Sequence, residues 1–204
     1  MTETRTDAIV IGAGFIGSSV AAHLRWRGLS VRLLVHGIVT AAKRDGVEVH
    51  QGARVTAIEP DGAGWRVRTP IGDFTADVVV NAAGVWSPEI ASLVGAELSV
   101  MPIAGQMCTT APRPPFVRSV VAVQIDTRRT TEPACDIRQG YDGRIWLGTT
   151  NRPNSKDTTV TEADTQTIRA GVARVFPALD VVIEHAWAGI RPVPVDLLPI
   201  YGVM

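Results

Sequence analysis

The first segment of the chain constrains the fold more than any other, because it joins a strand, a glycine turn and a helix without a break. Residues 7–11 (Asp-Ala-Ile-Val-Ile) predict a buried strand, and residues 18–27 predict a helix. Between them Gly12, Gly14 and Gly17 have the spacing of a G-x-G-x-x-G turn. In such a turn the first glycine permits the bend, the second lets backbone approach a pyrophosphate, and the third allows close helix–strand packing. The segment therefore predicts a dinucleotide-binding unit; the alternative is a glycine-rich βα turn that binds nothing.

The residue expected to bind the ribose is not acidic in this sequence. A dinucleotide fold places Asp or Glu about 20 residues further on, at the end of the second strand. That strand is predicted over residues 30–35, and the position at its end is His36. A neutral imidazole donates one hydrogen bond but cannot accept two, as a carboxylate does. The ribose is therefore expected near His36, with weaker binding than a carboxylate would give.

Composition favours a globular protein and excludes several classes of partner. The 204 residues have a net charge of zero and no basic block, which argues against a nucleic-acid partner. There is no apolar run long enough for a transmembrane helix and no signal-peptide core at the N-terminus. Cys108 and Cys135 fit no metal spacing and are expected to be free, buried thiols. These features together predict a cytoplasmic protein.

The first half predicts an α/β fold with a parallel sheet. Apolar runs typical of buried parallel strands occur at 7–11, 30–35, 46–50 and 77–82. A short helix is expected at 38–44, between the second and third of these runs. Period-two alternation and turn residues between 55 and 76 predict a β-meander beside these strands. The strand at 77–82 is expected to be buried in the sheet, with small residues at its carboxyl end leaving room for a ligand.

The second half predicts a separate α+β domain. Strands are expected at 120–125, 134–139, 144–149 and 181–190, and a helix capped by Thr161 at 161–175. Together they indicate an antiparallel sheet with one covering helix. The predicted domains are 1–102 for the nucleotide, 103–190 for a substrate-type sheet, and 191–204 as a segment returning to the first domain.

The order of motifs resembles the FAD-dependent amine and amino-acid oxidoreductases, of the D-amino-acid oxidase, glycine oxidase and sarcosine oxidase kind. The stretches that carry the resemblance lie at 9–17, 43–50, 77–87, 102–106, 137–143 and 187–202, the last reading Trp-Ala-Gly-Ile-Arg-Pro-Val-Pro-Val-Asp-Leu-Leu-Pro-Ile-Tyr-Gly. They span nearly the whole chain in the order of the family. Family members are longer, which implies an internal deletion after Val35 and a shortened C-terminus here.

The resemblance implies a flavoprotein with the Rossmann-like FAD-binding fold and amino-acid oxidation as its activity. A substrate C–N bond is oxidised by hydride transfer to flavin, and no catalytic acid, base or metal is required. Arg191 corresponds to the arginine that binds the substrate carboxylate; the alternative is an ion pair with Asp196 or with a surface carboxylate. Gly105 and Gln106 are expected near the flavin ring. The residues implied to contact FAD are Gly12, Ala13, Gly14, Phe15, Ile16, Gly17, His36, Val55, Ala82, Ala83, Gly84 and Trp86.

Two functions remain open at this point. The first is an FAD-dependent oxidoreductase acting on a small amine or amino acid. The second is a non-catalytic remnant or subunit with a nucleotide-binding fold, completed by a second subunit or by a homo-oligomer. A weaker third reading is an NAD(P)-binding module, because the missing carboxylate after the second strand would suit a phosphorylated ribose.

Overall fold

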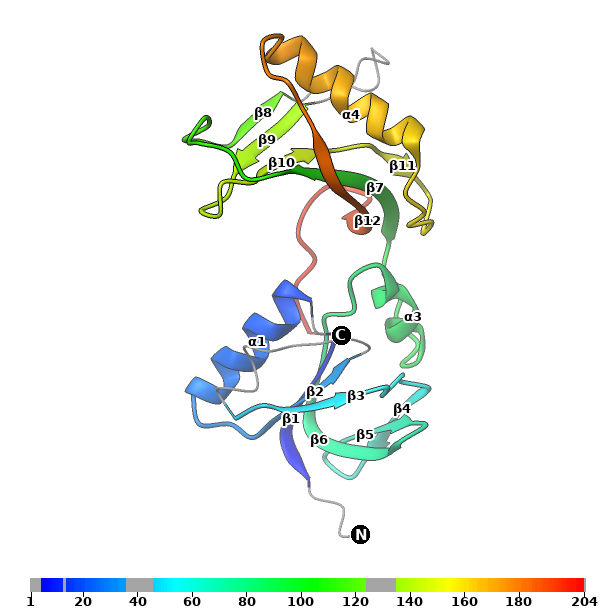
Figure 1. The fold of residues 1–204 in the computed structure, drawn as a ribbon. Helices are drawn as coiled ribbons and strands as arrows, with labels where there is room; N and C mark the ends of the chain where they lie inside the picture. Colours follow the sequence, from blue (N-terminus) through cyan, green and yellow to red (C-terminus); the bar gives the residue numbers. More distant parts are fainter. Residues whose placement is uncertain (1–4, 13, 36–45, 124–134, 204) are drawn as a thin grey trace. The chain divides into compact units, whose positions relative to one another are not determined.

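The computed structural model describes residues 5–12, 14–35, 46–123 and 135–203. These residues divide into two compact units, the first formed by Met1–Val100 with Pro194–Met204 and the second by Met101–Val193. Figure 1 shows a sheet in each unit, accompanied by helices in the first unit and by one long helix in the second. The helix expected at 38–44 lies outside the described residues. Among the described residues, no helix is long and apolar enough to cross a membrane.

The first unit is built on a six-stranded mixed sheet. Its order is β3-β2-β1-β6-β5-β4, with β1, β2, β3 and β6 parallel and β4, β5 and β6 antiparallel. The strands are β1 (Thr6–Ile11), β2 (Val31–Val35), β3 (Glu48–Gln51), β4 (Ala57–Asp61), β5 (Gly64–Thr69) and β6 (Gly72–Asn81). The predicted α/β class, parallel sheet and meander are confirmed.

Strand β6 joins the meander to the parallel sheet. Its first part pairs antiparallel with β5, Ala76 lying opposite Trp65, and its second part pairs parallel with β1, Val78 lying opposite Ala8. The sequence predicted the end of the meander before residue 77 and a separate strand at 77–82, whereas the structure has one continuous strand, Gly72–Asn81. The expectation that this strand is fully buried was wrong at Val78, which is 54% exposed.

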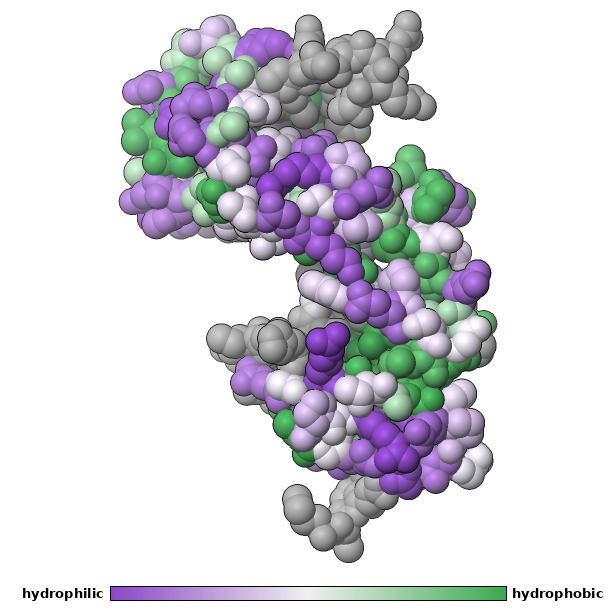
Figure 2. All heavy atoms as spheres, turned by 90° about the vertical axis from the view of Figure 1, so that its right-hand side faces the viewer, coloured by the Kyte–Doolittle hydropathy of each residue, from purple (hydrophilic) through white to green (hydrophobic). Residues whose placement is uncertain are grey.

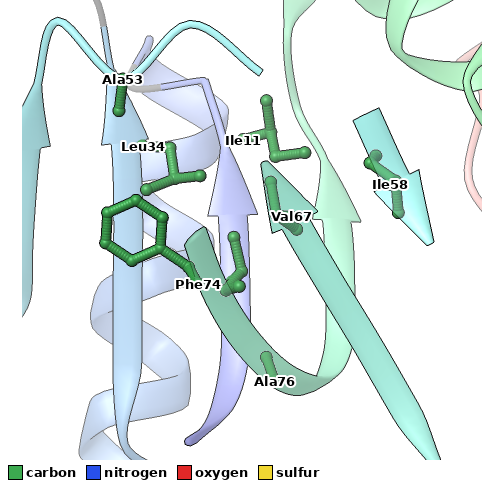
Figure 3. Packing of buried hydrophobic residues seen from close by; sticks show 8 residues of the cluster. Ile11, Leu34, Ala53, Ile58, Val67, Phe74 and Ala76 are labelled. Carbon is green, nitrogen blue, oxygen red and sulfur yellow. The ribbon is translucent and has the colours of Figure 1, made fainter. Parts of the chain in front are cut away.

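Both faces of the sheet carry an apolar cluster. Helix α1 (Phe15–Trp26) covers one face, where Val20 and Leu24 pack on Ala8, Val10 and other buried residues. The opposite face holds the cluster drawn in Figure 3, in which Phe74 and Val67 lie beside Leu34 and Ile11. Because β1 is covered on both faces, its sequence is continuously apolar rather than alternating.

The second unit is an antiparallel sheet covered by helix α4 (Glu162–Val175). The sheet order is β11-β7-β10-β9-β8, and β12 also pairs with β7. Its strands are β7 (Val100–Thr110), β8 (Val121–Val123), β9 (Cys135–Gln139), β10 (Ile145–Gly148), β11 (Arg152–Pro153) and β12 (Ile183–Pro194). Ile168 and Val172 of α4 pack on Ile137 and Leu147. The predicted antiparallel sheet and its covering helix are confirmed.

Strand β7 was missed from the sequence, although it pairs with three other strands. Pro102 and Gly105 interrupt its apolar pattern, and Gln106, Thr109 and Thr110 are buried polar residues. A buried polar side chain gives no period-two signal, so the segment resembles a loop in sequence.

The buried amide of Gln106 fastens β7 to the start of α4. Its Nε2 donates to the carbonyl of Thr161 (3.2 Å) and to Oγ1 of Thr165 (2.8 Å), while its Oε1 accepts from the backbone N–H of Thr161 (2.8 Å). Thr161 in turn caps the helix by accepting from the N–H of Asp164. The side chain of Gln106 is thus fully buried against α4, and its expected place near the flavin ring stays a prediction.

Replacing Gln106 with leucine is expected to destabilise the protein. The substitution leaves the N–H of Thr161 and the hydroxyl of Thr165 without their partner in a buried place, which costs about 2–4 kcal/mol. Urea denaturation followed by circular dichroism measures the change. Gln166→Ala on the exposed face of α4 is the control and should change stability by less than about 0.5 kcal/mol. An equal loss of stability in the two variants would show that the hydrogen bonds of the buried amide do not stabilise the protein.

Candidate functional site

The glycine turn lies where the carboxyl ends of β1 and β6 meet. Ile11 and Asn81 are partners in the parallel ladder, and the N–H of Ala82 donates to the carbonyl of Ile11 at 2.8 Å. The N–H of Gly12 donates to the carbonyl of Leu34 at 3.0 Å, which ties the same turn to β2. In open α/β sheets ligands bind outside the carboxyl ends of the strands, at this kind of edge.

Gly12 and Gly17 are required by close backbone packing. A Cβ on Gly12 would lie 2.3 Å from the carbonyl oxygen of Ala82, and Gly12 has a φ of +102°, which favours glycine. A Cβ on Gly17 would lie 1.9 Å from the carbonyl oxygen of Gly12 and 3.2 Å from Cβ of Ala82. The first turn of α1 therefore packs directly on the loops that follow β1 and β6.

Gly14 differs from Gly12 and Gly17, because no heavy atom of the described residues lies within 4 Å of the Cβ it would carry. It is exposed and forms the N-cap of α1, with no side chain capping the helix and no acidic residue in the first turn. An uncapped helix N-terminus presents N–H groups and the positive end of the dipole to an anion. The absence of a side chain at Gly14 keeps that approach open.

Asn81 organises the loop that carries three of the predicted contact residues. Its Nδ2 donates to the carbonyl of Ser87 (2.9 Å), and its Oδ1 accepts from the N–H of Ala83 (3.2 Å). Ala82, Ala83 and Gly84 are held between these two bonds, and Gly84 has a φ of +59°. Asn81 lies within the motif at 77–87 but was not predicted to have a role; an Asx residue directly before small residues is the signal that indicates such a turn.

The structure brings some of the other predicted residues to the same edge. Val55 packs on the cluster that contains Ile11, as Ala83 does. Ile16 lies exposed on the first turn of α1. Trp86 lies half exposed in the short 3-10 helix η1 (Gly84–Trp86), which leads into α3 (Ser87–Ser92). Figure 2 looks at this side of the unit and shows hydrophobic side chains around α3.

Three predicted contact residues are not available for comparison with the geometry. Ala13 and His36 lie outside the described residues, and for Phe15 the structure describes the helical backbone but not the side chain. Their roles as FAD contacts stay predictions. The same holds for the position of the ribose at His36.

In the second unit, Arg191 of β12 lies against β7 and the segment after β10. Its Nη2 donates to the carbonyl of Thr150 (2.9 Å) and to Oδ1 of Asn151 (2.7 Å), with Oγ1 of Thr149 at 3.4 Å. Within the second unit, the described residues give the guanidinium no carboxylate partner. Asp196, the alternative partner, belongs to the first unit, and its Oδ1 accepts from the N–H of Leu198 (3.0 Å). The substrate role of Arg191 and its pairing with a carboxylate of the chain both stay predictions.

Gly105 makes room for that arginine. A Cβ at this position would lie 2.3 Å from the carbonyl oxygen of Thr150 and 2.5 Å from Nη2 of Arg191. Only glycine at this position lets β7 lie this close to the carbonyl of Thr150 and to Nη2 of Arg191. The result is an exposed guanidinium held by neutral acceptors, an arrangement that suits binding of a carboxylate.

The described part of the second unit also holds two free cysteines and a pair of stacked tryptophans. Cys108 and Cys135 are free and buried, and burial raises the pKa of both thiols, which keeps them protonated near neutral pH. Trp146 and Trp187 pack edge to face, 5.2 Å between ring centroids, with Arg138 stacked over Trp146. In the part of the chain that the structure describes, no group of three or more His, Cys, Asp or Glu side chains could hold a metal.

Comparison with known proteins agrees with both the fold and the motifs. The family model described as "DAO: FAD dependent oxidoreductase" matches residues 32–204. The chain belongs to this family of FAD-dependent oxidoreductases. The resemblance drawn from the sequence motifs is thereby confirmed, and the matched range contains Arg191 and the loop after β6, while the glycine turn lies before it.

The lengths of two curated relatives can be compared with that of this DAO-family chain. Hydrogen cyanide synthase subunit HcnC of Pseudomonas protegens is 30% identical over 183 residues, covering 84% of this chain and 40% of the relative. Glycine oxidase of Geobacillus kaustophilus is 27% identical over 170 residues, covering 83% of this chain and 43% of the relative. The chain therefore spans about two fifths of the length of these curated relatives.

Solved structures show the same fold. The crystal structure of glycine oxidase from Geobacillus kaustophilus superimposes with a TM-score of 0.85 at 17% identity, covering 97% of this chain and 85% of that chain. L-proline dehydrogenase from P. horikoshii gives a TM-score of 0.78 at 14% identity, covering 98% and 85%. The structural shares are larger than those of the sequence alignments.

The two glycines of the turn are expected to respond differently to the same substitution. Gly17→Ala places a methyl group 1.9 Å from the carbonyl oxygen of Gly12, so helix and sheet must move apart and the protein should lose several kcal/mol of stability or fail to fold. Gly14→Ala meets open space and should leave the urea midpoint nearly unchanged. Equal stability of the two variants would contradict the packing described for Gly17.

Proposed function

We propose that this DAO-family chain is an FAD-dependent oxidoreductase that oxidises the C–N bond of a small amine or amino acid. The observation that carries the substrate class is Arg191, an exposed cation with no carboxylate partner among the described residues of the second unit. Arginine pairs with a carboxylate through two parallel hydrogen bonds, which fixes direction as well as charge. A substrate carrying a carboxylate beside its amine would satisfy this side chain.

The nucleotide half of the proposal rests on the turn at Gly12, Gly14 and Gly17. The uncapped N-terminus of α1 and the open space at Gly14 fit the pyrophosphate of FAD. Ala82, Ala83 and Gly84 lie at the carboxyl end of the neighbouring strand, where small residues permit close approach of a ligand. We infer that these two loops hold the cofactor.

The chain's own residues would bind and orient rather than transfer protons. FAD, when bound, supplies the chemistry by accepting the hydride from the carbon that carries the amine. Arg191 holds the substrate carboxylate and thereby fixes which bond is presented for oxidation. The helix N-terminus at Gly14 compensates the charge of the phosphates.

A second candidate function is a nucleotide-binding subunit that has no turnover by itself. The observation that favours it is the length comparison, because the chain aligns with about two fifths of its curated relatives. One of these relatives is itself named as a synthase subunit. Such a protein would need a second chain, or a second copy of itself, to complete a substrate site.

A measurement of FAD binding distinguishes both candidate functions, which require the cofactor or a nucleotide, from a glycine-rich turn that binds no ligand. Gly14→Val places a branched side chain where the pyrophosphate would lie and should weaken FAD binding at least about tenfold, without unfolding the protein. Quenching of flavin fluorescence on titration measures the affinity. Gly189→Ala, in open space on β12, is the matched control and should bind as the parent does. Equal FAD affinity of the Gly14 variant and the parent would overturn the assignment.

Arg191→Lys tests the substrate half of the proposal. Lysine keeps the charge but loses the paired geometry, so the apparent affinity for an amino acid should fall about tenfold or more. Arg118→Lys, an exposed arginine elsewhere in the same unit, is the control.

The readout is anaerobic bleaching of bound flavin with glycine, sarcosine, proline and D-alanine in turn. Because positioning contributes many orders of magnitude to rate, we expect slow bleaching or none by the isolated chain. FAD binding without bleaching by any of the four favours the subunit candidate. Rapid bleaching that is equal in the Arg191 variant and the parent would contradict the carboxylate role.

A further inference from the structure

The guanidinium of Arg191 is held from one side only. Every hydrogen bond that the structure gives it among the described residues uses Nη2, and the acceptors belong to Thr149, Thr150 and Asn151. The two shorter bonds, to the carbonyl of Thr150 and to Oδ1 of Asn151, match the two hydrogens that Nη2 carries. Within the second unit, the described residues give the hydrogens of Nη1 and Nε no acceptor.

The acceptors are also neutral. A backbone carbonyl and a side-chain amide fix the orientation of the guanidinium without cancelling its charge. An aspartate at position 151 would have nearly the same shape as asparagine but would form an internal ion pair. The structure therefore combines a fixed arginine with a full positive charge.

Asn151 itself is placed by two tethers to β7. On one side, the N–H of Gln106 donates to Oγ1 of Thr150 (3.0 Å), and the N–H of Thr150 approaches the carbonyl of Gln106 (3.3 Å). On the other side, Arg152 of β11 pairs with Ala104 of β7. The backbone of Asn151 lies between these two points, so its side-chain oxygen is a fixed acceptor rather than one on a free loop.

We propose that Asn151 is the positioning residue of the anion site at Arg191. Its amide oxygen takes the second hydrogen of Nη2, stops the guanidinium from pivoting about its bond to Thr150, and leaves the hydrogens of Nη1 and Nε to donate to an anion. An amide at this position, rather than a carboxylate, keeps the site cationic. The assignment rests on the proposed function for the identity of the anion, but the positioning of Arg191 is a property of this chain alone.

The first test measures the positioning without any ligand. Exchange-sensitive NMR of the ¹⁵N-labelled protein reports rotation of the Arg191 guanidinium, with its signal assigned by its loss in Arg191→Lys. Asn151→Ala removes one of two strong restraints on Nη2 and should speed this rotation several-fold. An unchanged rotation rate would overturn the proposal, whether or not the site binds anions.

The second test measures anion binding with acetate as the probe, followed through the Arg191 Nε signal. Asn151→Ala should weaken acetate binding by about three- to tenfold, since orientation is lost but charge is kept. Asn151→Asp should weaken it by at least about tenfold with no loss of thermal stability, because the geometry is kept and the charge is cancelled. Ser119→Asp adds the same charge on the connector before β8 and is the control.

The outcomes distinguish this proposal from the proposed function. If Asn151→Asp binds acetate as the parent and Ser119→Asp do, Asn151 does not position the anion site and the proposal fails. If acetate does not shift the Arg191 signal of the parent or of any variant, the carboxylate role of Arg191 is wrong. The rotation rates of the guanidinium still decide whether Asn151 positions the arginine. A fall in thermal stability of Asn151→Asp equal to its fall in affinity would indicate a structural role only.

Discussion

The backbone contact between the glycine turn and the loop after β6 is the constraint on which the first unit depends. Gly12 lies so close to Ala82, and Gly17 so close to Gly12, that neither position has room for a methyl group. Strand pairing of Ile11 with Asn81 brings the two loops together, and the absence of side chains lets them touch. A helix N-terminus and a small-residue loop can therefore share one edge of the sheet.

The second unit uses the same device for a different purpose. Gly105 brings β7 within contact of Nη2 of Arg191 and of the carbonyl of Thr150, so the guanidinium rests on backbone rather than on another side chain. In both units a glycine allows close packing of the backbone against a neighbouring group, and a polar group beside it is held in one orientation. In the first unit that group is the helix N-terminus, and in the second it is a fixed arginine.

Much of the fold could be predicted from the sequence, because buried parallel strands are continuously apolar and the meander alternates. The hydrophobic pattern gave wrong predictions where polar residues are buried or apolar residues are exposed. Strand β7 buries Gln106 against α4 and Thr110 beside Ile145, so it carries no apolar period. Conversely, Val78 is apolar but remains exposed, because hydrophobicity of a residue does not report which neighbours cover it.

The site was predictable only in part, for a similar physical reason. A glycine that must bend or must allow close approach is visible at a fixed spacing, and Arg191 is visible within its motif. Asn81 and Asn151 act through hydrogen bonds to backbone or to one guanidinium nitrogen, and such bonds depend on turn geometry that spacing does not encode.

An acceptor at position 151 that carried a negative charge would pair with Arg191 and leave it less attraction for an anion. The neutral amide of Asn151 and the carbonyl of Thr150 restrain the guanidinium without cancelling its charge, which is the condition that the proposed carboxylate role requires.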